Sequence, residues 1–261
     1  MTVIALTIAG SDPSGGAGIQ ADLKTFHQHG VYGTSVLTLV TVQSTAGVAR
    51  VEPLAFDLVD QQLAHLLEDV TPNAAKTGAL GTAALVEVVA ARAKGAPFPL
   101  VVDPVMISKH GHRLIDEAAV QAVRSLLLPV CALVTPNTHE AAALTGRPVE
   151  TLPQAKDAAK ALADLGARAV LVKGGHLEGD AVDVLFAGGE LHEFRAARLD
   201  TPHTHGTGCT YSAAITARLA SGARLPHAVA GAKVWLTEAI RTGPRLGRGV
   251  GPVNHHAPVS G

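Results

Sequence analysis

Residues 204–210, which read THGTGCT, have the composition of an anion-binding loop. Glycines at positions 206 and 208 let the backbone turn tightly, so that consecutive amide N–H groups can point at one place. The small residues 211–220 then predict a helix, whose positive end would attract the same anion. Cys209 would lie in the first turn, where we expect the pKa of its thiol to be lowered. A phosphoryl-transfer enzyme needs such an anion site beside a proton acceptor.

A second group of polar residues could hold a phosphate and its metal ion. Lys173 ends a predicted strand before two glycines, so its ammonium could lie along a phosphate tail, or it could simply be a solvated lysine. Asn137 and Glu140 share one face at a predicted helix start, where they could bind a magnesium–phosphate complex or where Glu140 could cap the helix. Asp103 ends another predicted strand and is a further candidate metal ligand.

The glycine-rich residues 10–18 follow the first predicted strand and open a helix, so we expect them to border a ligand. Residues 16–21 match the dinucleotide fingerprint, which leaves a nicotinamide-dependent dehydrogenase as an alternative. That fingerprint expects an acidic residue at the end of the next strand, where Gln43 and Ser44 stand instead. A Walker phosphate loop is excluded, because the chain contains no Gly-Lys dipeptide.

The histidines form no recognisable metal motif. The pair His139-Glu140 resembles the start of a zinc-protease helix, but the second histidine position is Ala143. His203 and His205 have no third ligand at a familiar spacing. We therefore expect these histidines to be solvated or hydrogen-bonded.

Strand and helix patterns alternate along the chain and must position these loops. Runs rich in β-branched residues predict strands over 3–8, 34–42, 100–103, 132–135 and 169–173, and a pair of extended segments over 181–198. Helical periodicity predicts helices over 19–28, 57–70, 83–94, 117–128, 139–144, 153–165, 207–220 and 226–241. Right-handed crossovers then require a mostly parallel sheet with helices on both faces, and ligands collect at the carboxyl ends of its strands.

Composition narrows the class of protein further. The 261 residues, 47% of them hydrophobic, predict a single domain over 1–261, in which 243–261 form an irregular arm that lies on the surface or docks beside the site. With 21 basic and 22 acidic residues, the charge favours a small-molecule partner over nucleic acid or membrane. Two widely separated cysteines, and no apolar stretch of about 20 residues, predict a cytoplasmic protein.

Several motifs together resemble one family. The stretches SDPSGGAGIQADLKTF, VTPNTHEAAALTG, VKGGH, THGTGCTYSAA and GPVNH closely resemble hydroxymethylpyrimidine and phosphomethylpyrimidine kinases of thiamine biosynthesis, within the ribokinase-like superfamily. The resemblance implies a three-layer α/β/α sandwich with a mostly parallel central sheet. It also implies a homodimer that uses ATP and Mg²⁺ to phosphorylate 4-amino-5-hydroxymethyl-2-methylpyrimidine and then its monophosphate.

The resemblance also assigns roles to residues. Gln43 matches a glutamine that pairs with the pyrimidine, and a carboxamide can indeed answer both the donor and the acceptor of an aminopyrimidine. Cys209 matches a proposed catalytic base. The remaining assignments are an anion hole at Gly206 and Gly208, phosphate contact by Lys173, magnesium and phosphate binding by Asn137 and Glu140, and weaker substrate contacts at Gly10, Asp22 and Val105. Thr207, between the two glycines, is a further candidate for nucleotide binding, and Asp103 stays a further candidate for the metal.

One departure concerns substrate choice. Ala79 and Leu80 stand where the family pattern leads us to expect a methionine against the pyrimidine. The pocket could therefore be roomier, and a pyridoxal or pyridoxine kinase on the same fold stays an alternative. A pyrimidine-binding protein without catalytic activity is a third possibility, although it would not need Cys209 and Lys173 together.

Overall fold

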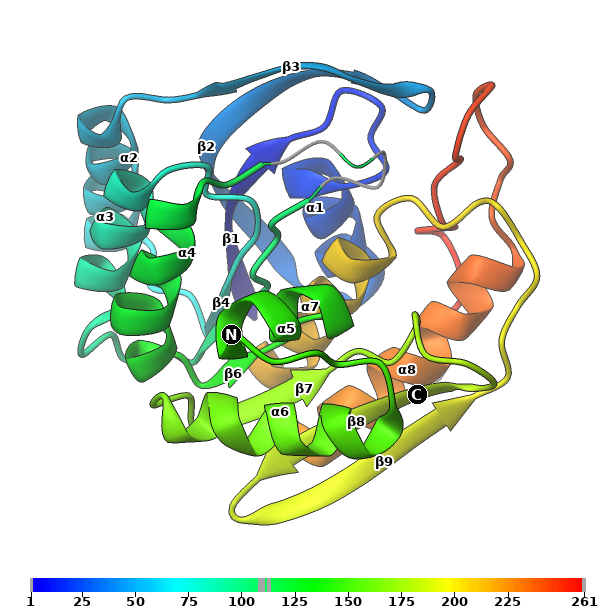
Figure 1. Cartoon of the computed structure of the whole chain (residues 1–261). Coiled ribbons are helices and arrows are strands. Elements are labelled where there is room, and N and C mark those ends of the chain that lie inside the picture. The colour runs from blue at the N-terminus through cyan, green and yellow to red at the C-terminus, as the bar shows by residue number, and fades with distance from the viewer. Residues whose placement is uncertain (1, 108–110, 112–113, 260–261) are drawn as a thin grey trace.

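The computed structural model describes residues 2–107, 111 and 114–259. Its central layer is a single β-sheet. Within these residues the sheet has nine strands in the order β3-β2-β1-β4-β5-β6-β7-β8-β9 (Figure 1). The strands are β1 (Ile4–Ser11), β2 (Tyr32–Ser44), β3 (Gly47–Pro53), β4 (Ala74–Thr77), β5 (Leu100–Val102), β6 (Leu133–Val134), β7 (Ala169–Val172), β8 (Ala181–Ala187) and β9 (Glu190–Ala196).

The predicted mostly parallel sheet is confirmed. Every pairing from β2 through β1, β4, β5 and β6 to β7 is parallel. The antiparallel pairings lie at the two edges, where β3 joins β2 and the β8–β9 hairpin joins β7. The hairpin turns at Gly188 and Gly189, with φ values of 59° and 85° that favour glycine, so the two extended segments predicted there are also confirmed.

Eight helices among the described residues cover the two faces of the sheet, and each predicted helix is present. They are α1 (Gly18–Gln28), α2 (Phe56–Asp69), α3 (Ala83–Ala93), α4 (Glu117–Ala122), α5 (Thr138–Thr145), α6 (Leu152–Asp164), α7 (Thr207–Ala220) and α8 (Leu225–Arg241). Leu100 and Val102 of β5 pack in one core with α2 to α6, whereas Val101 packs in another with α7 and α8. This alternation along one strand places helices on both faces and confirms the three-layer sandwich.

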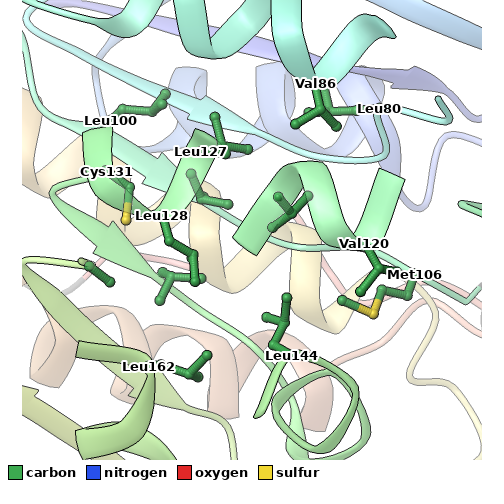
Figure 2. Close-up of a cluster of buried hydrophobic side chains, with 14 of the residues drawn as sticks. Leu80, Val86, Leu100, Met106, Val120, Leu127, Leu128, Cys131, Leu144 and Leu162 are labelled. Carbon is green, nitrogen blue, oxygen red and sulfur yellow. The ribbon is translucent and has the colours of Figure 1, made fainter. Parts of the chain in front are cut away.

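The larger core lies between the sheet and the α2–α6 layer. Figure 2 shows aliphatic side chains from several helices and strands meeting there with two sulfur-containing ones, and those labelled are Leu80, Val86, Leu100, Met106, Val120, Leu127, Leu128, Cys131, Leu144 and Leu162. All are buried. This packing fixes the carboxyl ends of the strands, from which the site is built.

Three local differences from the sequence prediction have physical causes. Strand β3 has no counterpart among the predicted strands, because its largely exposed residues at the sheet edge lack a clear hydrophobic alternation. Strand β4 reads AAKT and has little intrinsic strand preference, but complete burial between two strands imposes it. The segment predicted as one helix over 117–128 is α-helical only as far as Ala122, where α4 ends. A π-helical turn and then a 3₁₀ turn follow it. Pro129 lies in the 3₁₀ turn and has no N–H group to donate to a regular α-helical hydrogen bond.

The C-terminal segment docks beside the site. Within 243–259 the backbone forms no helix or long strand, and it is hydrogen-bonded to the rest of the protein. The Val250 amide donates to the Thr45 carbonyl at 2.9 Å, and the His205 amide donates to the Gly251 carbonyl at 3.0 Å. Residues 260–261 lie outside the described residues. No helix in the described part of the chain is both long and apolar enough to cross a membrane.

Candidate active site

A cleft of about 880 Å³ opens at the carboxyl ends of the parallel strands. It collects nearly all the residues that the sequence predicted for a site. The predicted residues that line it are Gly10, Gln43, Asp103, Val105, Asn137, Glu140, Lys173, Gly206, Thr207, Gly208 and Cys209. Only Asp22 of the predicted set is not among the lining residues.

The predicted anion cradle is the start of α7. Gly206 precedes the helix in the left-handed conformation, with φ 76°, and a Cβ there would collide with the carbonyl of Gly16. Only glycine meets both requirements without strain. The Thr207 hydroxyl donates to the Thr204 carbonyl at 2.8 Å and so holds the loop. No side chain of the described residues caps α7. The Thr207 amide donates to the Thr204 carbonyl at 3.3 Å, so the amides of Gly208 and Cys209 are the ones left for an anion at the helix start.

The structure corrects the expected acidity of Cys209. Burial raises the pKa of the Cys209 thiol to about 12, although the nearby Lys76 ammonium acts in the opposite direction. The carboxylates of Asp22 and Asp103 add to the increase, and the Gly18 N–H opposes it. The prediction of a lowered pKa was therefore wrong, because removal from water outweighs the helix terminus. Cys209 is a neutral thiol near pH 7 in the free protein.

Lys173 and Asp103 form an ion pair in the cleft. The Lys173 ammonium donates to Asp103 Oδ1 at 2.8 Å, and the hydroxyl of Ser212 donates to Asp103 Oδ2 at 3.2 Å. Burial disfavours the ammonium, but the carboxylates of Asp103 and Glu140 raise the pKa of Lys173. Lys173 is thus a cation held inside the cleft, and the alternative of a solvated surface lysine is wrong.

Asn137 and Glu140 cap the start of α5, which was one of the two roles that the sequence suggested for them. The Asn137 amide donates to Glu140 Oε2 at 2.8 Å, and the Glu140 amide donates to Asn137 Oδ1 at 2.9 Å. Burial raises the pKa of Glu140 to about 7, against the effect of the Lys173 ammonium. Because both residues also line the cleft, the cap fixes their positions in its wall.

The oxygen donors here suit a magnesium ion only in combination with other ligands. Among the described residues, no group of three or more His, Cys, Asp and Glu side chains is close enough to hold an ion alone. Carboxylates of Asp103 and Glu140 nevertheless face the same cleft as Lys173. Mg²⁺ is commonly bound by one or two carboxylates together with phosphate oxygens and water, so this donor set fits a metal that arrives with a nucleotide.

Gln43, the predicted contact of the substrate ring, lies close to the start of α7. Both β1 and β2 are longer than predicted, so that Gly10 and Gln43 lie on strands rather than after them. Gln43 Nε2 is 3.3 Å from Nε2 of His205, the residue that precedes Gly206. Residues far apart in sequence therefore bring the proposed ring contact and the anion cradle together, as the functional hypothesis requires.

The prediction that Asp22 contacts the substrate is wrong. Its side chain is completely buried, accepts from the Lys76 ammonium at 2.8 Å and accepts from the Thr7 hydroxyl at 2.6 Å. The inner face of α1 therefore turns this carboxylate toward β4 and β1, behind the cleft. Asp22 can influence the charge near Cys209 but does not line the cleft.

Sequence reasoning missed other polar residues of the cleft. Asp12 Oδ2 lies 2.7 Å from Nε2 of His205. Asp183 forms an ion pair with Lys233 at 2.7 Å and accepts a hydrogen bond from the Gly174 amide at 2.9 Å. For His205 the sequence predicted only solvation or an unspecified hydrogen bond, without identifying Asp12 as its partner. Asp12 could have been noticed as a carboxylate at a strand end, but nothing in the local sequence links Asp183 to Lys233.

The fold and this site together define a small-molecule kinase of the ribokinase-like class. A central, mostly parallel sheet carries a glycine-initiated helix start, a partly buried lysine and hard oxygen donors at one edge. The chain belongs to the phosphomethylpyrimidine kinase family, whose model matches residues 12–254.

Individual relatives agree with this assignment. The chain is 49% identical over 252 residues to a hydroxymethylpyrimidine/phosphomethylpyrimidine kinase of Streptomyces coelicolor, covering 97% of this chain and 94% of that protein. It is 47% identical to the thiamine biosynthesis bifunctional protein ThiED of Geobacter sulfurreducens, covering 96% of this chain and 51% of that one. An ADP complex of Bacillus subtilis pyridoxal kinase superposes with a TM-score of 0.92 at 40% identity, covering 98% of each chain.

Proposed function

We propose that this protein transfers the γ-phosphoryl group of ATP to the hydroxymethyl group of 4-amino-5-hydroxymethyl-2-methylpyrimidine, and then phosphorylates the monophosphate, in thiamine biosynthesis. The observation that carries this proposal is the position of Gln43 beside the residue that begins the anion cradle, within one cleft. A ring held by the carboxamide would have its hydroxymethyl arm next to the helix start. Family membership supports the same reaction.

Positioning and charge account for most of the proposed rate enhancement. Phosphoryl transfer has a loose transition state and needs little covalent chemistry from the protein. The first amides of α7 would hold the migrating phosphoryl group, and the Lys173 ammonium would neutralise phosphate charge. Asp103, which holds Lys173 at 2.8 Å, would keep that cation directed into the cleft.

Cys209 is the proposed acceptor of the hydroxymethyl proton. Its neutral state in the free protein means that the thiol must first lose its own proton. The Lys76 ammonium, which favours the thiolate, and the first amides of α7 are the groups that would stabilise the resulting anion. Only a small thiolate fraction is then available near pH 7, so the proposed role has a pH signature.

Mg²⁺ is proposed as the second cofactor. Asp103, Glu140 and Asn137 are its candidate ligands, directly or through water. When bound with the nucleotide, the ion would supply positive charge to the phosphate oxygens. Replacement of Glu140 by Gln, which can still accept the capping hydrogen bond, should raise the magnesium concentration needed for half-maximal activity while α5 stays folded.

A pyridoxal kinase is the second candidate function. Ala79, rather than a methionine, lines the cleft, and the similarity to the Bacillus subtilis pyridoxal kinase structure is high. By contrast, a non-catalytic pyrimidine-binding protein would have no need for the Lys173–Asp103 pair. The neutral residues Gln43 and Ser44 at the end of β2 disfavour the dehydrogenase.

A direct assay separates these functions. Purified protein is incubated with ATP, Mg²⁺ and one acceptor at a time, namely the hydroxymethylpyrimidine, its monophosphate or pyridoxal, and phosphorylated products are measured. We expect the highest kcat/KM for the pyrimidines and almost no turnover by Lys173→Met. Preference for pyridoxal would favour the second candidate, and NAD binding without any ATP turnover would favour a dehydrogenase.

The homodimer and the cytoplasmic location stay predictions. Light scattering during gel filtration would measure the mass in solution, for which we expect twice the 26.6 kDa of one chain. A single-chain mass would contradict the homodimer.

A further inference from the structure

The pair Asp12–His205 connects the two loops that border the cleft. His205 Nε2 lies 2.7 Å from Asp12 Oδ2, and both side chains are only 4% exposed. Asp12 also accepts hydrogen bonds from the amides of Ser14 and Ala17, at 2.9 and 2.8 Å. The carboxylate thus organises the loop after β1 while it holds the imidazole, so neither partner can turn away easily.

The direction of the hydrogen bond between Asp12 and His205 is determined by their chemistry. Burial opposes ionisation of Asp12, but hydrogen bonds from His205 and Ser14 lower the pKa of this carboxyl, so it is a carboxylate near neutral pH. A carboxylate only accepts hydrogen bonds. His205 must therefore carry a proton on Nε2, whether its ring is neutral or charged.

This proton has a consequence for Gln43. The end of its carboxamide nearest His205 lies 3.3 Å from the same Nε2 atom. An amide NH₂ at that end would face an imidazole N–H, and two donors would oppose each other. A rotation of the Gln43 carboxamide by 180° exchanges its NH₂ group and its oxygen without changing the space that the group occupies. The carbonyl oxygen then faces His205 Nε2 and can accept the same proton that is donated to Asp12.

We infer that the Asp12–His205 pair is a specificity device, which fixes the orientation of the Gln43 carboxamide with its oxygen toward His205 and so determines where a ligand must offer a donor. This inference rests on the proposed function. His205 acts through Gln43 and is a positioning residue. The orientation is thereby set before a ligand enters.

The two candidate ligands differ at the positions that such an amide would contact. Next to its hydroxymethyl arm, the aminopyrimidine carries an exocyclic amine, a donor, followed by a ring nitrogen, an acceptor. Pyridoxal carries an aldehyde oxygen, an acceptor, followed by a hydroxyl. A carboxamide whose oxygen and NH₂ group have fixed positions matches the donor and acceptor of the aminopyrimidine. With pyridoxal, the same amide oxygen would face the aldehyde oxygen. A site that leaves polar groups unpaired in this way binds the mismatched ligand much more weakly.

Two substitutions at the same position test this role. His205→Gln retains a side-chain NH₂ that can donate to Asp12 and face Gln43, whereas His205→Met retains bulk without a donor. We expect the ratio of dissociation constants for pyridoxal and hydroxymethylpyrimidine to fall about tenfold in His205→Met, the size of one lost hydrogen bond, and to stay within about threefold of the parent value in His205→Gln. ATP affinity should be unchanged in both variants.

Different failures are distinguishable. Equal weakening of both ligands in His205→Met would mean that His205 only supports the fold, and an unchanged ratio would also overturn the inference. If the parent protein binds neither ring, the proposed function itself fails. A measurement on the unaltered protein covers the case in which His205→Met does not fold: ¹⁵N NMR of the histidine rings should show His205 protonated on Nε2, and a proton-free Nε2 would overturn the inference.

Discussion

The two ends of the cleft are built in different ways. The anion cradle consists of main-chain groups from one short segment, with Gly206 in its left-handed conformation at the start of α7. The ring end consists of side chains from distant segments, where Gln43 of β2, Asp12 and His205 meet. The proposed charge stabilisation at the cradle is thus a local property of the sequence, whereas the proposed ring selectivity depends on how the whole sheet positions its strand ends.

Gly206→Ala should cause the largest loss, because it breaks the cradle itself. The added Cβ would meet the carbonyl of Gly16, and φ 76° is strained for alanine. Displacement of the first amides of α7 should lower kcat by roughly 10³-fold, comparable with the loss of a preorganised oxyanion donor. Steady-state kinetics with saturating ATP and pyrimidine would measure the effect.

Gly222→Ala is the matched control for that variant. Gly222 has a similar positive φ of 86°, but a Cβ there meets nothing within 4 Å. This control carries the backbone strain without the collision, so kcat should stay close to the parent value. Equal turnover losses in the two variants would show that strain alone, rather than the shape of the cradle, explains the effect of Gly206→Ala.

The pH dependence of kcat and the Cys209→Ala variant test whether the anion cradle can support turnover without a catalytic base. Since the thiol has a pKa of about 12, its thiolate fraction should rise about tenfold for each pH unit between pH 7 and 9, and kcat should rise with it. Cys209→Ala should lower kcat by about 10²-fold at pH 8 and remove this slope. Cys131, whose pKa burial also raises to about 12, lies in the core, so Cys131→Ala should retain the slope. Full turnover by Cys209→Ala would show that the amides suffice without a base.

The contrast between the two ends also explains what the sequence could predict. Gly206, Gly208 and Cys209 are adjacent in the chain, and their place at a helix start follows from glycine chemistry and the helical run after them. The acidity of Cys209 was mispredicted because desolvation depends on neighbours such as Asp22, which come from other elements. Local patterns carry no information about that environment.

The ring end was predicted only in part. Gln43 was identified through a family resemblance, and its neighbour His205 was noticed for a different reason. Their contact spans 162 positions in the sequence, so it depends on the fold, which brings the end of β2 and the loop before α7 to the same cleft. Strand β4, which precedes Ala79 of the same cleft, has no clear strand pattern because burial rather than propensity creates it.

Gln43→Ala should damage the ring end and leave the cradle intact. Loss of the carboxamide removes the paired donor and acceptor, so KM for the hydroxymethylpyrimidine should rise roughly tenfold to a hundredfold, while KM for ATP changes little. Initial rates with each substrate varied in turn would measure both. Gln121→Ala, at an exposed glutamine that contacts Glu117, is the control and should change neither constant. Equal increases in both KM values would mean that Gln43 supports the fold.

Ala79→Met should have the smallest effect and would sharpen the comparison at the ring end alone. The Ala79 carbonyl accepts from the Thr38 hydroxyl at 2.7 Å, so the backbone there is anchored and only the side chain changes. A methionine would add apolar contact with the ring, and KM for the pyrimidine should fall about twofold to fivefold. Leu80→Met, in the core with 3% exposure, should leave KM unchanged. A higher KM in Ala79→Met would instead show that a neighbouring side chain already fills this space, and that discrimination between pyrimidine and pyridoxal depends on polarity at Gln43 rather than on pocket volume.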